Sequence, residues 1–256
     1  MKRKIINIIN SFYISFLKKK KNINYNIIHL GTFYGGYDIV DLKNIKIIIS
    51  CGLGEDASFD IEIINKYYAK NIILDPTPRS IIHFNSIKKN FGKRRIFSYR
   101  AKGGKLHARS YNLKKINSNN MIFLNKAISD KNNDKMKLYY PNNKKMVSAS
   151  IYKDKNYSNN FFLANTIDLN SLIKKYKIKK IDILKLDIEG GEINILNNLL
   201  KKKIFPKQIL VEFKDIKTIN PIKFIKIYCI NKKLSDNGYS FIFKNKKGDI
   251  TYLKNA

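Results

Sequence analysis

Acidic side chains that follow apolar runs are the first candidates for chemistry. Asp75 ends the run NIILD, Asp187 and Glu189 follow IDILKL, and Glu212 lies near the end of QILVEF. A carboxylate at such a position can bind ribose or substrate hydroxyls, or act as a general base on an alcohol. Lys185 lies two residues before Asp187 in an otherwise apolar run, where a lysine needs a partner or a function. An internal ion pair with these carboxylates is the structural alternative.

A glycine turn is the second chemical feature. The apolar run over residues 45–49 leads into SCGLGED, where Gly52 and Gly54 allow a tight turn and a close approach of the backbone to a ligand. A helix that starts near Asp56 would direct free N–H groups at the same space. On its own this pattern indicates a nucleotide loop and a plain tight turn about equally well.

The spacing between Gly52 and Asp75 adds weight to the nucleotide loop. Asp75 lies 23 residues after Gly52, which is where a βαβ nucleotide site places the carboxylate that binds ribose hydroxyls. The alternative for Asp75 is a helix cap or turn acid before Pro76 and Pro78.

Alternating strands and helices would position these residues. Continuous apolar runs, typical of strands buried on both faces, lie at 45–49, 71–75, 121–127, 181–186 and 208–213. Apolar residues at helical spacing predict helices over 57–68, 79–90, 166–179 and 221–234, and a further helix opened by Gly190 and Gly191. Ligands bind at the carboxyl ends of strands in open α/β sheets, so we expect the acids and the glycine turn to share one crevice.

The remaining segments are expected to be connections and closing strands. Residues 137–141 predict a hairpin, and the Asn-, Ser- and Lys-rich residues 142–165 predict a mobile connection. The strands YSFIFK and GDITYL, joined by a hairpin-like turn at 245–248, predict a final antiparallel strand.

The segment LGTFYGGYDIVD, residues 30–41, predicts a loop or short strand that folds over a ligand. A plain connecting turn is the alternative. Tyr34 and Gly36 in this segment, together with Glu212, are candidate substrate residues.

The composition limits the class of partner. The net charge is +32, but only six of the 51 basic residues are arginine, and the lysines are spread through an Asn- and Ile-rich chain. AT-rich coding produces such a composition, and base readout and phosphate binding favour arginine, so a solvated surface is preferred to a nucleic-acid or anionic-membrane patch. Residues 91–120 hold four of the arginines and would be the place for an anionic substrate, with a solvated excursion as the alternative.

The cysteines and the N-terminus indicate the compartment. Neither Cys51 and Cys229 nor the three histidines have metal-ligand spacing, so we predict no metal and a reduced, cytoplasmic location. Residues 1–21 place 13 mostly apolar residues between basic ends, too few to span a bilayer. They predict an amphipathic helix that lies on an anionic membrane surface or packs on the domain or a partner subunit. We expect a helical extension over 1–29 and one domain over 30–256.

Four motifs together resemble the FkbM-type S-adenosylmethionine-dependent methyltransferases. They are the glycine turn at 50–56, NKAISDK at 125–131 with its following hairpin, LKLDIEGGE at 184–192, and VEF at 211–213. The resemblance covers about residues 30–253. It implies an α/β class I methyltransferase (Rossmann-like) fold, with a mostly parallel seven-stranded sheet, helices on both faces and an antiparallel terminal strand.

The resemblance also implies methyl transfer from S-adenosylmethionine to a hydroxyl of a sugar, a glycan or a related metabolite. By motif position, Gly52 and Gly54 would approach the methionine part of the cofactor, with Glu55 nearby, and Asp75 would bind the ribose hydroxyls. The stretch from Asn125 to Ala127 would lie by the adenine.

The same resemblance places Asp187 by the methyl donor and acceptor. Asp187 or Glu189 is then the candidate general base, and Lys185 would set its ionisation or orientation. The chain departs from the family pattern at two points: Asp56 and Ala57 stand in place of a third glycine, and Asp75 stands where many members have Glu.

Two other functions stay open on the residues alone. A dinucleotide oxidoreductase of the NAD type would use the same turn and Asp75, although the missing third glycine and the antiparallel last strand count against it. A non-enzymatic nucleic-acid or membrane-surface binder would use the positive charge. Nothing in the sequence indicates an oligomeric state.

Overall fold

The computed structural model describes residues 25–97, 103–143, 145–214 and 221–255. The helix predicted over 1–21 lies outside the described residues, so its contact with a membrane or a partner stays a prediction. No helix in the described ranges is long and apolar enough to cross a membrane.

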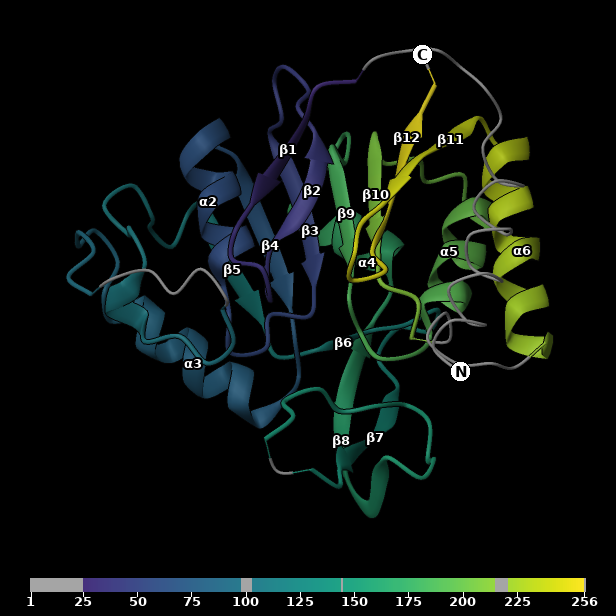
Figure 1. Cartoon of the computed structure of the whole chain (residues 1–256), viewed down its shortest axis with the longest axis horizontal. Coiled ribbons are helices and arrows are strands. Elements are labelled where there is room, and N and C mark those ends of the chain that lie inside the picture. The colour runs from purple at the N-terminus through teal and green to yellow at the C-terminus, as the bar shows by residue number, and fades with distance from the viewer. Residues whose placement is uncertain (1–24, 98–102, 144, 215–220, 256) are drawn as a thin grey trace.

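A seven-stranded sheet forms the centre of the fold (Figure 1). Its strand order is β11-β12-β10-β9-β3-β4-β5. The parallel strands are β3 (Ile47–Cys51), β4 (Lys70–Leu74), β5 (Met121–Leu124), β9 (Ile183–Leu186) and β10 (Gln208–Val211). The last strand, β12 (Ile250–Lys254), is antiparallel to β10 and to β11 (Tyr239–Lys244), which confirms the predicted antiparallel end of the sheet.

Alternate residues of these strands enter two separate hydrophobic clusters, as the period of two of a strand requires. One cluster holds Ile48, Ile73 and Leu210 with residues of α2 (Ser58–Tyr67) and α3 (Pro78–Lys88). The other holds their strand neighbours, such as Ile49 and Ile72. It includes residues of α4 (Leu169–Tyr176), α5 (Glu192–Lys201) and α6 (Pro221–Asp236). The continuous isoleucine runs therefore supply side chains to both hydrophobic clusters.

A second, three-stranded sheet corrects the predicted mobile connection. β6 (Ala127–Ile128), β8 (Tyr157–Ile167) and β7 (Lys135–Pro141) pair in that order, below the main sheet in Figure 1. Most β8 residues are exposed or half-buried, and its short apolar stretch at 161–164 is flanked by asparagines on both sides, as in a loop. β8 also shortens the helix predicted over 166–179, which begins at Leu169 after Asp168 accepts a capping bond from the Ser171 N–H.

An N-terminal hairpin joins β1 (Ile27–Leu30) to β2 (Tyr37–Val40). The domain boundary expected between His29 and Leu30 falls inside β1, so the hairpin is continuous with the domain. The Gln208 side chain fixes it to the main sheet, since its amide accepts from the Val40 N–H and donates to the Val40 carbonyl.

Candidate active site

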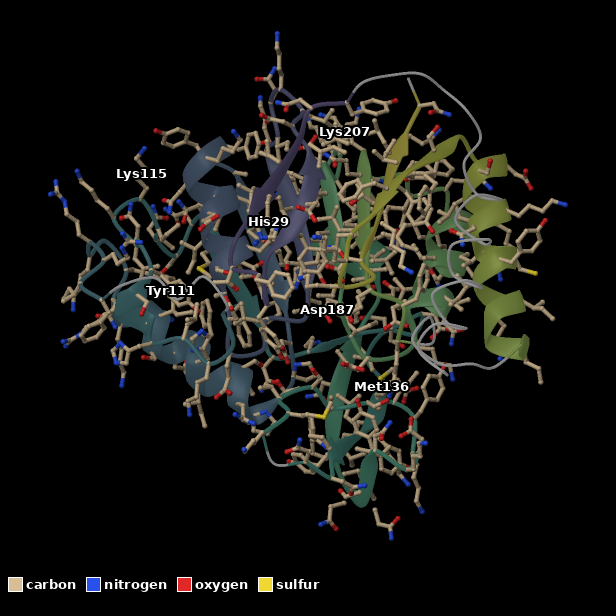
Figure 2. All side chains as sticks on the ribbon, viewed as in Figure 1. His29, Tyr111, Lys115, Met136, Asp187 and Lys207 are labelled. Atoms are coloured by element: carbon tan, nitrogen blue, oxygen red, sulfur yellow. The ribbon has the colours of Figure 1, made fainter. Side chains whose placement is uncertain are left out.

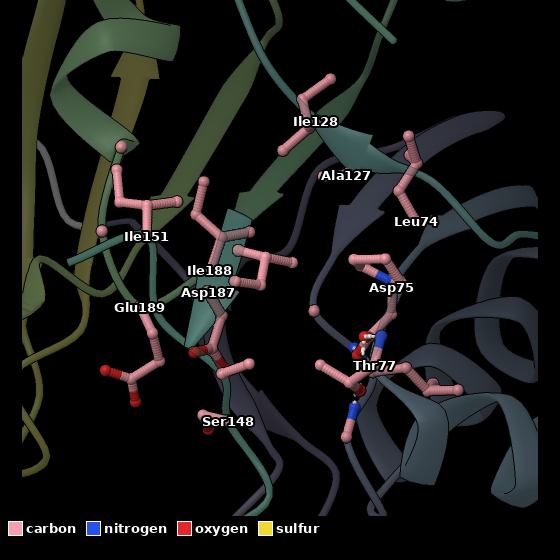
Figure 3. A pocket seen from close by; sticks show the side chains of 18 of the residues that line it. Leu74, Asp75, Thr77, Ala127, Ile128, Ser148, Ile151, Asp187, Ile188 and Glu189 are labelled. Atoms are coloured by element: carbon pink, nitrogen blue, oxygen red, sulfur yellow. Dashed lines mark hydrogen bonds between the residues drawn. The ribbon is translucent and has the colours of Figure 1, made fainter. Parts of the chain in front are cut away.

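A cavity of about 260 Å³ lies at the carboxyl ends of β3, β4 and β9, close to the size range of small-ligand sites (Figure 3). Asp187 lies near the middle of the molecule, with Met136 of the small sheet below it in Figure 2. The cavity brings together nine of the residues predicted for the site: Tyr34, Gly52, Gly54, Asp75, Ala127, Lys185, Asp187, Glu189 and Glu212.

The glycine turn has the backbone that its sequence predicts. Gly52 and Gly54 have positive φ angles of 92° and 60°. A Cβ at Gly52 would lie 1.9 Å from the Asp187 carbonyl oxygen, so no other residue fits between the ends of β3 and β9. At Gly54 the nearest atom to a Cβ would be a methyl carbon of Val147 at 4.0 Å, so this glycine borders open space of the cavity.

Asp75 anchors this turn. Its Oδ2 accepts the N–H groups of Leu53 and Gly54, both at 2.9 Å. Its Oδ1 accepts the N–H of Thr77 at 2.8 Å and the Thr77 hydroxyl at 2.7 Å. Four donors therefore occupy the carboxylate of Asp75. Asp75 thus acts as a turn acid, and it binds both the glycine turn and the segment that precedes α3. Contact of Asp75 with ribose hydroxyls stays a prediction.

A buried tyrosine holds the candidate base. The Tyr37 hydroxyl donates to Oδ2 of Asp187 at 2.8 Å, and the Asp187 side chain is 33% exposed. Burial, followed by the charge of Asp187, raises the pKa of Tyr37 well above its usual value, so the hydroxyl stays protonated and donates. No sequence pattern singled out Tyr37, because a tyrosine at the start of a short strand is ordinary.

Lys185 forms an internal ion pair with Asp187, the structural alternative expected for it, and it also binds the glycine turn. Its Nζ lies 3.9 Å from Oδ2 of Asp187 and donates to the Gly52 carbonyl at 2.5 Å. It also lies 5.0 Å from the centre of the Tyr37 ring. The buried ammonium thus joins the glycine turn, the candidate base and the hairpin.

Glu189 fixes the loop between β7 and β8 to the cavity. Its Oε2 accepts from the Tyr157 hydroxyl at 3.3 Å, and its carbonyl accepts from the Ser150 hydroxyl at 2.8 Å. Lys214 donates to the same Ser150 oxygen at 2.5 Å. Val147, Ser148, Ala149 and Ile151 of this loop line the cavity, so the segment predicted to be mobile supplies one of its walls.

Glu192, the last residue of the motif LKLDIEGGE, is a buried acid. It is 4% exposed and accepts from the Gly190 N–H at 2.7 Å. Burial raises the pKa of Glu192 to about 8, so it is mostly protonated at neutral pH.

Three predicted site residues do not line the cavity. Glu55 turns away from it and pairs with Arg79, which also donates to the Met146 carbonyl at 3.0 Å. Asn125 is exposed in the link between the two sheets. Gly36 serves the hairpin loop, because a Cβ there would lie 2.3 Å from the Thr32 carbonyl oxygen. A residue next to a glycine turn need not face the ligand, because positive φ angles redirect the chain.

A model of the methyltransferase FkbM domain matches residues 41–241. The chain belongs to this methyltransferase family. The family predicted from the four motifs is thereby confirmed, and the dinucleotide oxidoreductase is set aside. No curated protein and no solved structure matches the chain.

The FkbM match ends short of both described termini. The hairpin with Tyr34 and Tyr37 precedes residue 41, and β12 with the turn before it follows residue 241. The hairpin loop that contributes Tyr34 and Gly35 to the cavity is therefore outside the matched part of the chain, as is the turn between β11 and β12.

The charges of the FkbM cavity decide which nucleotide fits it. Six carboxylates line it, and Lys185, which already binds Gly52 and Asp187, is the one cationic side chain among its lining residues. A pyrophosphate would meet repulsion here, whereas a cationic group is favoured. The apolar side chains of Leu74, Ile128 and Ile188 leave room for a flat base. The lining therefore suits S-adenosylmethionine, which has a sulfonium and no phosphate.

Proposed function

We propose that this FkbM domain transfers a methyl group from S-adenosylmethionine to a hydroxyl of a sugar, a glycan or a related metabolite. The observation that carries the proposal is the acid-lined cavity at the carboxyl ends of β3, β4 and β9, with a glycine turn on one side and Asp187 on another. The family establishes a methyltransferase. The cofactor and the hydroxyl acceptor are our inference from the lining of the cavity.

Gly52, Gly54, Ala127 and Ile128 would hold the cofactor, which supplies an electrophilic methyl carbon on a sulfonium centre. The glycine turn brings main-chain atoms to the cavity, and Asp75 keeps the turn in one conformation through the Leu53 and Gly54 N–H groups. A fixed turn matters because alignment of the reacting atoms is the main task in a displacement of this kind.

Asp187 is the proposed general base. An acceptor hydroxyl beside it would lose its proton to the carboxylate as its oxygen bonds to the methyl carbon, while the bond from that carbon to sulfur breaks and leaves a neutral thioether. Tyr37 donates to Oδ2 and fixes the plane of the carboxylate. Lys185 offsets part of the negative charge that Asp187 shares with its acidic neighbours.

A hydroxyl-rich acceptor fits the mouth of the cavity. Tyr34 is 55% exposed there, and its aromatic ring offers an apolar face to a sugar ring. Glu189 and Glu212 also line the cavity, and carboxylates accept hydrogen bonds from hydroxyl groups.

Calorimetric titration of the full chain with S-adenosylmethionine tests the cofactor. We expect saturable binding that Gly54→Ala abolishes, because the added Cβ enters the cavity. Gly92→Ala is the matched control, since Gly92 also has a positive φ, 78°, but a Cβ there would meet nothing within 4 Å and Gly92 does not line the cavity. Absence of binding to the parent chain would refute the proposal.

Radiolabelled methyl transfer to a panel of glycans tests the acceptor. We expect label on a hydroxyl oxygen, and an Asp187→Asn variant that still binds the cofactor but transfers no label. Transfer by the parent chain only to amines or thiols would overturn the O-methylation part of the proposal.

A further inference from the structure

The turn between β11 and β12 is unusually well fixed for a surface hairpin turn. Oδ1 of Asn245 accepts the main-chain N–H groups of Lys247, Gly248 and Asp249, each at 3.0 Å. The Asn245 amide also donates to Asp249 at 2.8 Å and to Asp38 of the N-terminal hairpin at 3.2 Å. The turn is thus one rigid unit attached to the N-terminal hairpin.

Lys247 extends from this turn to the loop of the N-terminal hairpin. Its Nζ donates to the carbonyl oxygens of Gly36 at 2.6 Å and Tyr34 at 3.1 Å, and it lies 3.1 Å from Oδ2 of Asp249. An ammonium has three protons, and these partners account for all of them. The Nζ also lies 4.9 Å from the centre of the Tyr37 ring. An ordinary surface ion pair would join Lys247 to Asp249 alone, whereas here the Nζ also binds two carbonyl oxygens.

In the described ranges, the other hydrogen bonds of this loop run to the residues around the start of α2 and to His29, whose Nε2 lies 3.2 Å from the Thr32 carbonyl oxygen. The Thr32 N–H donates to the Ser58 hydroxyl at 2.9 Å, and the Thr32 hydroxyl donates to Asp56 at 2.6 Å. The N–H groups of Gly35 and Gly36 return to Thr32 itself. Lys247 supplies the attachment to the turn between β11 and β12, at the carbonyl of Tyr34, which lines the cavity.

Tyr34 and Gly35 of this loop line the cavity. Tyr34 shares this lining with Asp187, Glu189 and Glu212, the acids of the acceptor side. Burial and then the charges of these acids raise the pKa of Tyr34. The cofactor side, formed by the glycine turn and Asp75, is held by bonds that do not involve Lys247.

We propose that Lys247 is a positioning residue that holds Tyr34 on the acceptor side of the cavity. Two segments outside the family-matched residues 41–241 then select the acceptor. This inference rests on the proposed function, because the acceptor side of the cavity is defined by the proposed methyl transfer. The contact between the two segments stands on geometry alone.

Hydrogen-exchange mass spectrometry of the full chain tests the contact. We expect Lys247→Met to speed exchange of the peptide that covers residues 32–36 about tenfold, because a lost charge-assisted hydrogen bond loosens the loop by that order. Lys247→Arg should restore slow exchange, because a guanidinium can also donate to two carbonyls. Lys246→Met is the matched control, since Lys246 is the exposed neighbour in the same turn.

Calorimetry with S-adenosylmethionine separates the two sides of the cavity. We expect Lys247→Met, Lys247→Arg and Lys246→Met to bind it with dissociation constants within about twofold of that of the parent chain. The reason is that the glycine turn is held by hydrogen bonds that do not involve Lys247. Unchanged exchange in Lys247→Met would refute the contact, and faster exchange throughout the domain would make Lys247 a general stabiliser instead. Loss of cofactor binding together with faster loop exchange would place the loop on the cofactor side. Failure of the parent chain to bind refutes the proposed function, while the exchange result still decides the contact.

Discussion

The Tyr37 hydroxyl donates to Oδ2 of Asp187 at 2.8 Å, across 150 residues of sequence. Tyr37 lies in the hairpin before the matched FkbM segment, and Asp187 follows β9 inside it. The candidate base is therefore oriented by a part of the chain that the family model does not include.

Removal of this hydroxyl should slow methyl transfer. We expect Tyr37→Phe to lower kcat by about tenfold or more, because a hydrogen bond to a charged group contributes roughly 1.5–3 kcal/mol, and to leave cofactor binding intact. The matched control is Tyr67→Phe, which removes a hydroxyl that donates to Asp41. Equal loss of kcat in the two variants, measured with the acceptor found in the glycan panel, would contradict the positioning role.

Asp75→Asn should destabilise the chain even without ligand. An asparagine amide nitrogen cannot accept the two donors that one carboxylate oxygen now binds, so we expect a loss of about 1–3 kcal/mol in the free energy of unfolding. Asp130→Asn, at an exposed residue of the cavity lining, is the control. Urea unfolding measures both. Unchanged stability of Asp75→Asn with weaker cofactor binding would instead indicate a ribose contact.

Gly52→Ala should prevent the native approach of β3 to β9. The Cβ would lie 1.9 Å from the Asp187 carbonyl oxygen, and Gly52 has a positive φ as well. We expect a loss of more than about 3 kcal/mol or failure to fold, seen by circular dichroism and urea unfolding. Gly92→Ala has the same backbone requirement without the collision, and it should cost only about 1 kcal/mol.

Glu192 should make stability depend on pH. The pKa of Glu192 in the folded state, about 8, lies above its usual value of 4.5, so the folded state binds an extra proton between these two pH values. Glu192 therefore makes the free energy of unfolding fall as pH rises from about 5 to 8, by at most about 1.4 kcal/mol per pH unit. Glu192→Gln keeps the oxygen that accepts from Gly190 and should remove this slope in unfolding experiments. An unchanged slope would assign it to other groups.

The main sheet was predictable because its strands are buried on both faces. Isoleucine runs such as 45–49, and the acids that follow β4, β9 and β10, predict a cavity at the carboxyl ends of the strands, where it lies. β8 was not predictable, because asparagines interrupt its apolar residues and the segment 142–165 is polar as a whole. The direction of Glu55 was not predictable either, since the positive φ of Gly54 and the distant Arg79 determine it.

The contact of Lys247 with Gly36 also sets an order in time. The two residues are 211 positions apart. At about 5–20 residues per second, tens of seconds pass on the ribosome between synthesis of the hairpin loop and synthesis of the lysine that holds it. The parallel strands and the glycine turn can form in that interval, but the loop with Tyr34 cannot yet be held by Lys247. A nascent chain therefore has the elements of its cofactor side before it can exclude unsuitable acceptors.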